Sequence, residues 1–181
     1  MFKKTAHKKI IKSCIRGDRK AQYELYEMNK VYLFGVCMRY SKTKEEAEDI
    51  LQDAFYKIFK DLKQFNGEVP IQAWMRKVTI NTALMHIRKN KNLKYVELDE
   101  FKYEQTAHID NAFLTENRAS DIIHIIRKLP DVQQMVFNLR AMDEYPFKEI
   151  SEMMGGNEAT LRSHYLRARK SLQSMLKKEL Y

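Results

Sequence analysis

Histidine, cysteine and carboxylate side chains are the residues most able to bind a metal or to act in acid–base catalysis, and their spacing here supports neither role. A carboxylate-bridged metal centre in a helical bundle, as in a metal-carboxylate oxidase, needs repeated Glu-x-x-His pairs. No histidine follows a glutamate by three residues, and the nearest pattern is Asp121 before His124. A glycine-rich phosphate loop and a Gly-x-Ser-x-Gly nucleophile motif are also missing from the sequence. We therefore expect a binding protein with no catalytic residue, no metal ligand and no cofactor.

The charge balance of the chain favours a polyanionic partner. Lys and Arg number 33 against 24 Asp and Glu, a formal net charge of +9, which suits nucleic acid or an acidic membrane surface without choosing between them. No stretch approaches the roughly 18 uninterrupted apolar residues of a spanning helix, and the N-terminus lacks the apolar run of a signal peptide. Cys14 and Cys37 form no Cys-x-x-Cys pair and are expected to be buried thiols of a reduced compartment. We expect a cytoplasmic protein with no membrane insertion of its own.

Positively charged residues are arranged most regularly over residues 145–172. Pro146 suits the first turn of a short helix, the Gly155-Gly156 pair permits the left-handed backbone that ends it, and Asn157 can cap a second helix. The inward stripe of that second helix is Leu161, Tyr165, Ala168 and Leu172. Its opposite side carries Arg162, Ser163, Leu166, Arg167 and Lys170. The pattern is typical of a DNA-binding helix-turn-helix, and the alternative is an αα-hairpin with a solvated basic side.

The most regular apolar pattern predicts a helix over residues 44–65. Its apolar stripe is Ala47, Ile50, Leu51, Ala54, Phe55, Ile58, Phe59 and Leu62. Its other side begins with Glu45, Glu46, Glu48, Asp49, Gln52 and Asp53. Negative charge near a helix N-terminus stabilises the macrodipole, whereas an acidic side also suits docking to a basic protein partner. The residue types alone favour neither interpretation.

A loop and a helix rich in aromatic and cationic residues follow. Glycine and proline interrupt helix formation over residues 65–70, and the next helix is expected at residues 71–91. The single tryptophan, Trp74, stands near its start, and the nearby cations are Arg76, Lys77 and Arg88. Aromatic rings and positive charge beside a loop suit single-stranded nucleic acid. The alternative is that Trp74 is core and the cations are solvated, and we expect Trp74 to be at least partly core.

The expected fold class is all-α, because the chain has only 5 Gly and 3 Pro and no run of β-type alternation. Gly17 should end a first helix and Asp18 should cap a second one. That second helix is nearly apolar all round toward its end and is therefore expected in the middle of a bundle.

Two helical domains are predicted, joined by a flexible linker. Acidic residues and fading periodicity indicate the linker over residues 92–117. The first domain would span residues 1–91. The second would span residues 118–181, with helices that end at Pro130 and Met142 before the helix-turn-helix.

The order of these pieces resembles the extracytoplasmic-function (ECF) sigma factors, a group within the sigma-70 family of bacterial RNA polymerase. The resemblance covers nearly the whole chain apart from the predicted linker. Residues 47–55, AEDILQDAF, are similar to the helix with which the family binds core polymerase, where acidic and amide side chains meet a basic coiled coil. The resemblance implies a core-polymerase-binding face made of Glu48, Asp49, Gln52 and Asp53, and it favours docking over the macrodipole interpretation.

Residues 65–83 resemble the family's segment for the downstream (minus-ten) promoter element. Residues 65–72 are similar to its loop that captures a flipped base, and residues 73–83 to its strand-opening helix, with Asn81 at a near-fixed asparagine position. An unstacked base can be read on its edge by loop groups. The expected downstream contacts are Phe65, Asn66, Gly67, Ile71, Gln72, Trp74, Arg76, Lys77, Asn81 and Arg88.

Residues 159–163, ATLRS, and residues 167–169, RAR, resemble the family's domain that reads the upstream (minus-thirty-five) element. The expected upstream contacts are Thr160, Arg162, Ser163, His164, Leu166, Arg167 and Lys170.

We therefore predict a promoter-specificity subunit whose partners are core RNA polymerase and promoter DNA. The resemblance also implies a helical anti-sigma protein as a partner. The alternative function is a stand-alone helix-turn-helix regulator, which would need neither a polymerase-docking face nor a strand-opening region.

Overall fold

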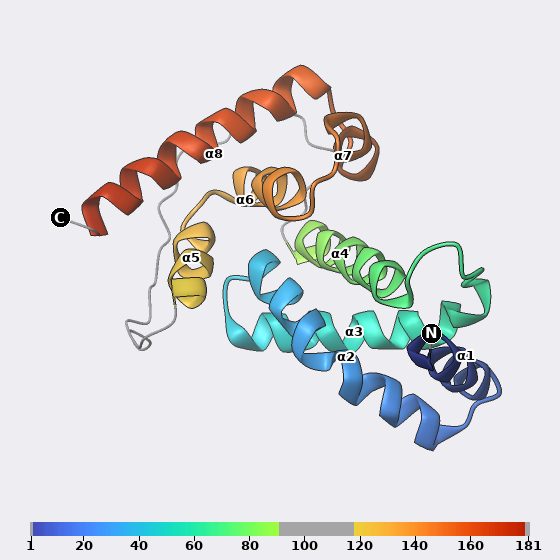
Figure 1. Cartoon of the computed structure of the whole chain (residues 1–181). Helices are drawn as coiled ribbons and strands as arrows, with labels where there is room; N and C mark the ends of the chain where they lie inside the picture. Colours follow the sequence, from blue (N-terminus) through green and yellow to red (C-terminus); the bar gives the residue numbers. More distant parts are fainter. Residues whose placement is uncertain (1, 91–117, 180–181) are drawn as a thin grey trace. The chain divides into compact units, whose positions relative to one another are not determined.

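The computed structural model describes residues 2–90 and 118–179, and the predicted linker over residues 92–117 lies outside the described residues (Figure 1). Within the described ranges the regular structure is all helical, which confirms the predicted fold class. The chain divides into two compact units, Met1–His86 and Ile87–Tyr181, with the boundary inside the fourth helix.

The first unit is built around the packing of α2 (Arg19–Tyr40) against α3 (Lys44–Asp61) and α1 (Phe2–Ile15). The 3₁₀ turn Leu62–Gln64 follows α3, and α4 (Ile71–Asn90) comes after a loop. The apolar stripe predicted for α3 is confirmed by the buried residues Ala47, Ile50, Leu51, Ala54, Phe55 and Ile58. The α-helix ends at Asp61 rather than Phe65, because the chain tightens into the 3₁₀ turn that buries Leu62.

Polar side chains cap the N-termini of α2 and α3. Gly17, at φ 85°, follows the end of α1. Asp18 accepts hydrogen bonds from the backbone N–H groups of Lys20 (2.9 Å) and Ala21 (3.2 Å), which confirms it as the N-cap of α2. Thr43 Oγ1 accepts from the Glu46 N–H at 3.1 Å, and so satisfies one of the first donors of α3.

The prediction that α2 lies in the middle of a bundle is wrong for one of its sides. Its buried residues are Ala21, Leu25, Asn29, Leu33, Val36, Cys37 and Tyr40. Four large apolar side chains are exposed instead, with exposed fractions of 65% at Tyr23, 48% at Met28, 78% at Val31 and 47% at Tyr32. Helices α1 and α3 pack against only part of the α2 circumference, so its remaining apolar residues face outward in the described chain.

The second unit contains α5 (Arg118–Arg127), α6 (Asp131–Phe137), a π-helical segment (Asn138–Met142), α7 (Phe147–Met154) and α8 (Glu158–Glu179). Its core joins α5 to α8 through Ile125, Ile126, Leu129, Ala168 and Leu172, with Phe137 and Met175 packed against them. Helix α8 also packs against α6 and α7.

The single helix predicted over residues 131–142 is α-helical only to Phe137. The last turn widens, because the Asp143 N–H donates to the Asn138 carbonyl (2.9 Å) and the Tyr145 N–H donates to the Leu139 carbonyl (2.9 Å). Glu144 has a φ of 61°, which is uncommon for a residue with a Cβ, and Pro146 follows two residues later. The wide turn and the left-handed residue together redirect the chain into α7.

Gly35 and Gly17 should respond to alanine in opposite directions. Gly35 lies inside α2, where an added Cβ meets no atom within 4 Å, so Gly35→Ala should stabilise the first unit by about 0.5–1 kcal/mol. Gly17 has a φ of +85°, so Gly17→Ala should destabilise the same unit by about 1 kcal/mol. Urea unfolding followed by the fluorescence of Trp74 reports on this unit. If both substitutions shifted the urea midpoint in the same direction, the backbone conformations assigned to Gly35 and Gly17 would be wrong.

Candidate nucleic-acid interface

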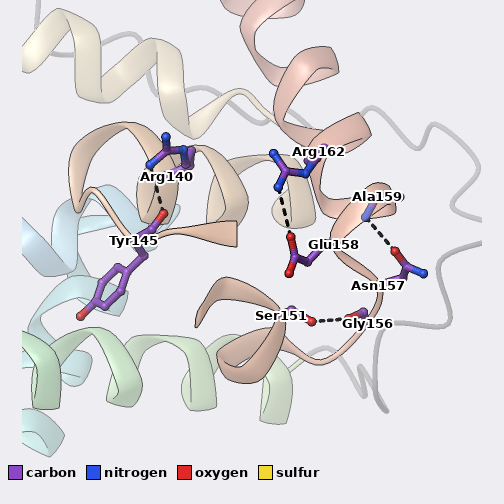
Figure 2. Close-up of polar contacts among 8 residues, drawn as sticks. All are labelled: Arg140, Tyr145, Ser151, Gly156, Asn157, Glu158, Ala159 and Arg162. Carbon is purple, nitrogen blue, oxygen red and sulfur yellow. Dashed lines mark hydrogen bonds and ion pairs between the residues drawn. The ribbon is translucent and has the colours of Figure 1, made fainter. Parts of the chain in front are cut away.

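The turn between α7 and α8 is held by its own backbone and two polar side chains (Figure 2). Gly155 and Gly156 have φ angles of 72° and 101°, as the sequence predicts for this pair. The Gly155 N–H donates to the Ser151 carbonyl (2.9 Å), and the Ser151 hydroxyl donates to the Gly156 carbonyl (2.6 Å). Asn157 Oδ1 accepts from the Ala159 N–H at 2.7 Å and so caps α8. These bonds set the direction in which α8 leaves the turn.

The two sides of α8 have the predicted residues. Leu161, Ala168 and Leu172 are buried, and Tyr165 is half-buried among them. The exposed residues that were predicted to contact the upstream element are Arg162, Ser163, Leu166, Arg167 and Lys170. Thr160 and His164 are half-buried at the border between the two sides. The exposed side therefore combines positive charge, a hydroxyl and the apolar side chain of Leu166.

Arg162 has two neighbours that orient its guanidinium. Its Nη2 lies 3.1 Å from Glu158 Oε2, one helical turn earlier on α8. Its Cζ lies 4.4 Å from the ring centroid of Phe147, the first residue of α7. The first residues of both helices in the turn therefore contribute to one polar and aromatic site.

Arg140 is a cation of this surface that the sequence analysis did not single out. It is exposed on the π-helical segment, its Cζ lies 5.5 Å from the Phe147 ring centroid, and its Nη1 donates to the Tyr145 carbonyl at 3.4 Å. Figure 2 shows Arg140 and Arg162 coming from different elements of the second unit. Arg140 lies on the widened turn that precedes α7, and no sequence spacing signals its approach to the Phe147 ring.

His164 is half-buried at the border of the basic side of α8. Its Nδ1 atom is buried and has no hydrogen-bond partner among the described residues. Burial, and next the positive charge of Arg167, lower the pKa of His164 below its usual value near 6.5. The imidazole is therefore neutral at pH 7.

The loop before α4 is a tight turn joined to an aromatic pair. The Glu68 N–H donates to Asn66 Oδ1 at 3.1 Å, and Gly67 has a φ of 82°. The rings of Phe65 and Trp74 lie 5.7 Å apart between centroids, tilted by 56°, and both side chains are half-buried. Trp74 is therefore partly core, as the sequence predicts, and keeps an accessible part beside the loop.

The residues predicted to contact the downstream element differ in exposure. The exposed ones are Asn66, Gly67, Gln72, Lys77 and Asn81, and the half-buried ones besides the aromatic pair are Arg76 and Arg88. Ile71 departs from the set, because it is only 7% exposed and its side chain belongs to the core. Sequence spacing did not separate Ile71 from its exposed neighbours, since residues on each side of it are polar or loop-forming.

Helix α4 has a well-defined exposed side. Lys77, Asn81 and Met85 are exposed and follow one another at four-residue spacing, which places them on the same side of the helix. On the buried side the hydroxyls of Thr79 and Thr82 donate to the carbonyls of Met75 (2.9 Å) and Val78 (2.8 Å). The buried threonines are thus satisfied within α4, and Asn81 is directed outward.

The acidic side of α3 is exposed opposite its buried stripe. The four predicted docking residues, Glu48, Asp49, Gln52 and Asp53, are all exposed. The macrodipole acts mainly on charges in the first turn of a helix. That turn contains Glu45 and Glu46, whereas Asp49 and Asp53 lie beyond it. Dipole stabilisation therefore does not account for the acidic side, and the exposed phenol of Tyr56 extends it by one more turn.

Two family models match successive parts of the chain. Sigma-70 region 2 matches residues 25–93, and Sigma-70 region 4 matches residues 119–172, so together they span more than half of the chain. The ECF RNA polymerase sigma factor SigW of Bacillus subtilis is 26% identical over 180 residues, covering 94% of this chain and 96% of the relative. The ECF RNA polymerase sigma-E factor of Escherichia coli K12 is 23% identical over 175 residues, covering 91% of both chains.

The chain belongs to the ECF sigma factors of the sigma-70 family. It is therefore a non-catalytic subunit of RNA polymerase that acts in transcription initiation. The predicted family, function class and lack of enzymatic activity are confirmed by these matches.

Two solved structures share the fold of this sigma factor. CnrH, solved in complex with the cytosolic domain of CnrY, aligns with a TM-score of 0.51 at 16% identity over 93% of this chain and 96% of that chain. The sigma factor RpoE of Bartonella quintana, solved with the anti-sigma factor NepR, aligns with a TM-score of 0.53 at 19% identity, over 86% of this chain and 96% of that chain.

Across residues 2–90 and 118–179, no helix is long and apolar enough to cross a bilayer. The same part of the chain holds no group of three or more histidine, cysteine or carboxylate side chains that could bind a metal ion.

His164 predicts a pH dependence of stability. Its pKa is lower in the folded than in the unfolded chain, so the unfolded chain binds more protons as the pH falls below about 6.5. The contribution of neutral His164 to the stability of the folded chain is therefore complete above that pH. It is lost as the pH falls toward the pKa of His164 in the folded chain. We expect His164→Gln to reduce the loss of thermal stability of the second unit between pH 7.5 and pH 5.5. His124→Gln, at an exposed histidine of the same unit, is the matched control and should leave the loss unchanged.

Proposed function

We propose that this sigma factor binds core RNA polymerase through the acidic side of α3, made of Glu48, Asp49, Gln52 and Asp53. The observation that carries this proposal is the exposure of carboxylates beyond the first turn of α3, in a chain whose net charge is +9. A concentrated acidic side on a basic protein is complementary to a basic protein surface and unfavourable next to DNA phosphates. The acidic side of α3 is therefore suited to polymerase and unsuited to DNA, so the two partners would contact different parts of the chain.

The loop at residues 65–70 and the exposed side of α4 bind the opened downstream element in this proposal. The accessible parts of Phe65 and Trp74 supply rings on which unpaired bases stack, and Lys77 supplies charge for the phosphates. Asn81 contacts the opened strand from the same side of α4 as Lys77. The Ile71 side chain is left out of this surface because it is buried.

The exposed side of α8 reads the upstream element as duplex. Arg162 and Arg167 have the hydrogen-bonding geometry for base edges or phosphates in the major groove, and Ser163 and Lys170 extend the contact along the helix. We assign core binding and the downstream element to the domain of residues 1–91, and the upstream element to the domain of residues 118–181. The DNA affinity of the assembled enzyme should then fall steeply with salt.

The proposed setting is the cytoplasm, with an anti-sigma protein as a further partner. Support for that partner comes from the similar sigma factor of Bartonella quintana, which was solved with the anti-sigma factor NepR. Transcription in vitro with core polymerase over a random promoter library tests the whole proposal, because a stand-alone regulator would bind duplex DNA without starting transcription.

Asp49→Arg should abolish binding to core polymerase. The substitution puts a positive charge on the acidic side of α3, and like charges facing each other across an interface cost several kcal/mol. We expect the affinity for core polymerase to fall by about 100-fold or more, measured by competition between sigma factors for labelled core. Glu24→Arg makes the same charge change at an exposed position of α2 and should retain binding. Equal losses in the two variants would assign the effect to net charge instead of the α3 face.

Asn81→Ala should separate promoter binding from promoter opening. Asn81 is exposed on α4, so its truncation leaves no buried group unsatisfied. Closed-complex formation should be retained, whereas strand opening should fall by about tenfold or more, since a bidentate hydrogen-bonded contact from an amide to a base edge is worth roughly 1–3 kcal/mol. Fluorescence of a base analogue in the downstream element measures opening. Normal opening by Asn81→Ala holoenzyme would show that the assignment of Asn81 is wrong.

A further inference from the structure

The guanidinium of Arg162 is oriented in the DNA-free protein. Glu158 Oε2 lies 3.1 Å from its Nη2, and the Phe147 ring centroid lies 4.4 Å from its Cζ. The side chain of Arg162 is nevertheless 56% exposed. The guanidinium therefore has a preferred position and remains accessible to a ligand from solvent.

Phe147 is itself held by a neighbouring ring, which is supported in turn by a third. Its ring meets the ring of Tyr165 edge to face, with centroids 5.8 Å apart and planes at 74°. The Tyr165 ring in turn stacks on Phe137, at 6.1 Å and 21°. Edge-to-face and offset-stacked pairs are the favoured geometries for aromatic rings. Phe147 thus belongs to a row of rings that joins α6, α7 and α8, and it is a firm support for a side chain placed on it.

An arginine on an aromatic ring keeps its hydrogen-bonding edge available. The flat side of the planar guanidinium is attracted to the electron-rich face of the ring. Its N–H groups can then reach the O6 and N7 acceptors of a guanine or a phosphate oxygen. A long side chain that is already oriented also loses less conformational freedom when it binds.

We infer that Phe147 is a positioning residue for upstream promoter recognition, acting by holding the Arg162 guanidinium in the orientation that DNA binding requires. This inference rests on the proposed role of α8 in reading the upstream element. Phe147 lies on α7, so the first helix of the helix-turn-helix contributes to sequence reading by supporting a residue of the second. A purely structural role for Phe147 would instead affect the stability of the unit and all contacts of α8 alike.

The first test examines the free full-length protein and does not depend on polymerase. An aromatic ring shifts the NMR resonances of groups above it, so the Arg162 side-chain Nε–Hε signal should lie away from those of exposed arginines. Phe147→Leu should move it back to the ordinary position, whereas Phe147→Tyr should keep the shift. A signal that is the same in the wild type and in Phe147→Leu would overturn the inference.

The second test is a double-mutant cycle in reconstituted holoenzyme. The measured quantity is the ratio of affinities for a promoter with an intact upstream element and one with that element scrambled. Phe147→Leu should lower this ratio by about two- to fivefold, the range expected for an exposed cation–π contact. Phe147→Tyr should keep the ratio near wild type. Because Arg140 also lies on the Phe147 ring, the cycle is run with Arg140→Ala present throughout. In that background Phe147→Leu should still lower the ratio when Arg162 is intact, and it should cause no further loss once Arg162→Ala is added, because its effect passes through Arg162.

The outcomes separate this inference from the proposed function. With Arg140→Ala present throughout, an equal loss from Phe147→Leu with and without Arg162 would mean that Phe147 acts structurally, and it would overturn the inference while leaving the role of α8 intact. If the wild-type chain forms no holoenzyme, the proposed function fails, and the NMR comparison alone decides whether Phe147 positions Arg162. Thermal unfolding of each variant identifies any that fails to fold. If Phe147→Leu fails, the wild-type Arg162 Nε–Hε signal decides, and a signal at the position of the exposed arginines overturns the inference.

Discussion

Burial of one apolar stripe on each helix decides what every exposed side of this protein presents. Ala47, Ile50 and Ile58 of α3 have no exposed surface, and neither do Leu161 and Ala168 of α8. Since a helix turns by 3.6 residues, burying these positions sets the outward direction of every other side chain on the same helix. The acidic side of α3 and the basic side of α8 are therefore consequences of core packing. A change that rotated either helix would remove its proposed binding side together with its core contacts.

The separation of charge between helices suits two chemically different partners. Helix α3 collects carboxylates in a chain with a net charge of +9, and α8 presents arginine and lysine on its exposed side. Phosphates repel the first surface and attract the second, whereas a basic protein surface does the reverse. In the proposed function, electrostatics therefore directs each partner to its own helix before any specific contact forms. Interactions with phosphates also weaken as salt rises, which would make the proposed DNA contacts more sensitive to ionic strength than the buried core.

Local backbone geometry determines where the residues of α8 that we propose to read the upstream element start. Gly155 and Gly156 adopt positive φ angles that residues with a Cβ rarely adopt, and Asn157 caps the helix immediately afterwards. The Ser151 hydroxyl closes the turn from α7. Because Arg162 lies only one turn into α8, its place depends directly on these few bonds. The aromatic row of Phe137, Tyr165 and Phe147 then connects this turn to the rest of the unit.

The amino-acid sequence by itself determined the features that depend on neighbours in the chain. The apolar stripe of α3, the Asp18 cap, the glycine turn and the two sides of α8 follow from helical spacing and from the conformations that single residues permit. The order of motifs was also enough to indicate the ECF sigma family, because order and spacing are properties of the chain.

Tertiary structure alone decided the features that depend on which helix packs where. The exposed apolar side of α2, the burial of Ile71 and the π-helical end of α6 are not visible in spacing, and neither is the position of Arg140 and Arg162 on one phenylalanine ring. An apolar residue is buried only if another element covers it, and two cations meet on one ring only if the chain turns to bring them there. Both conditions are set by contacts between residues far apart in sequence, and helical periodicity carries no information about such contacts.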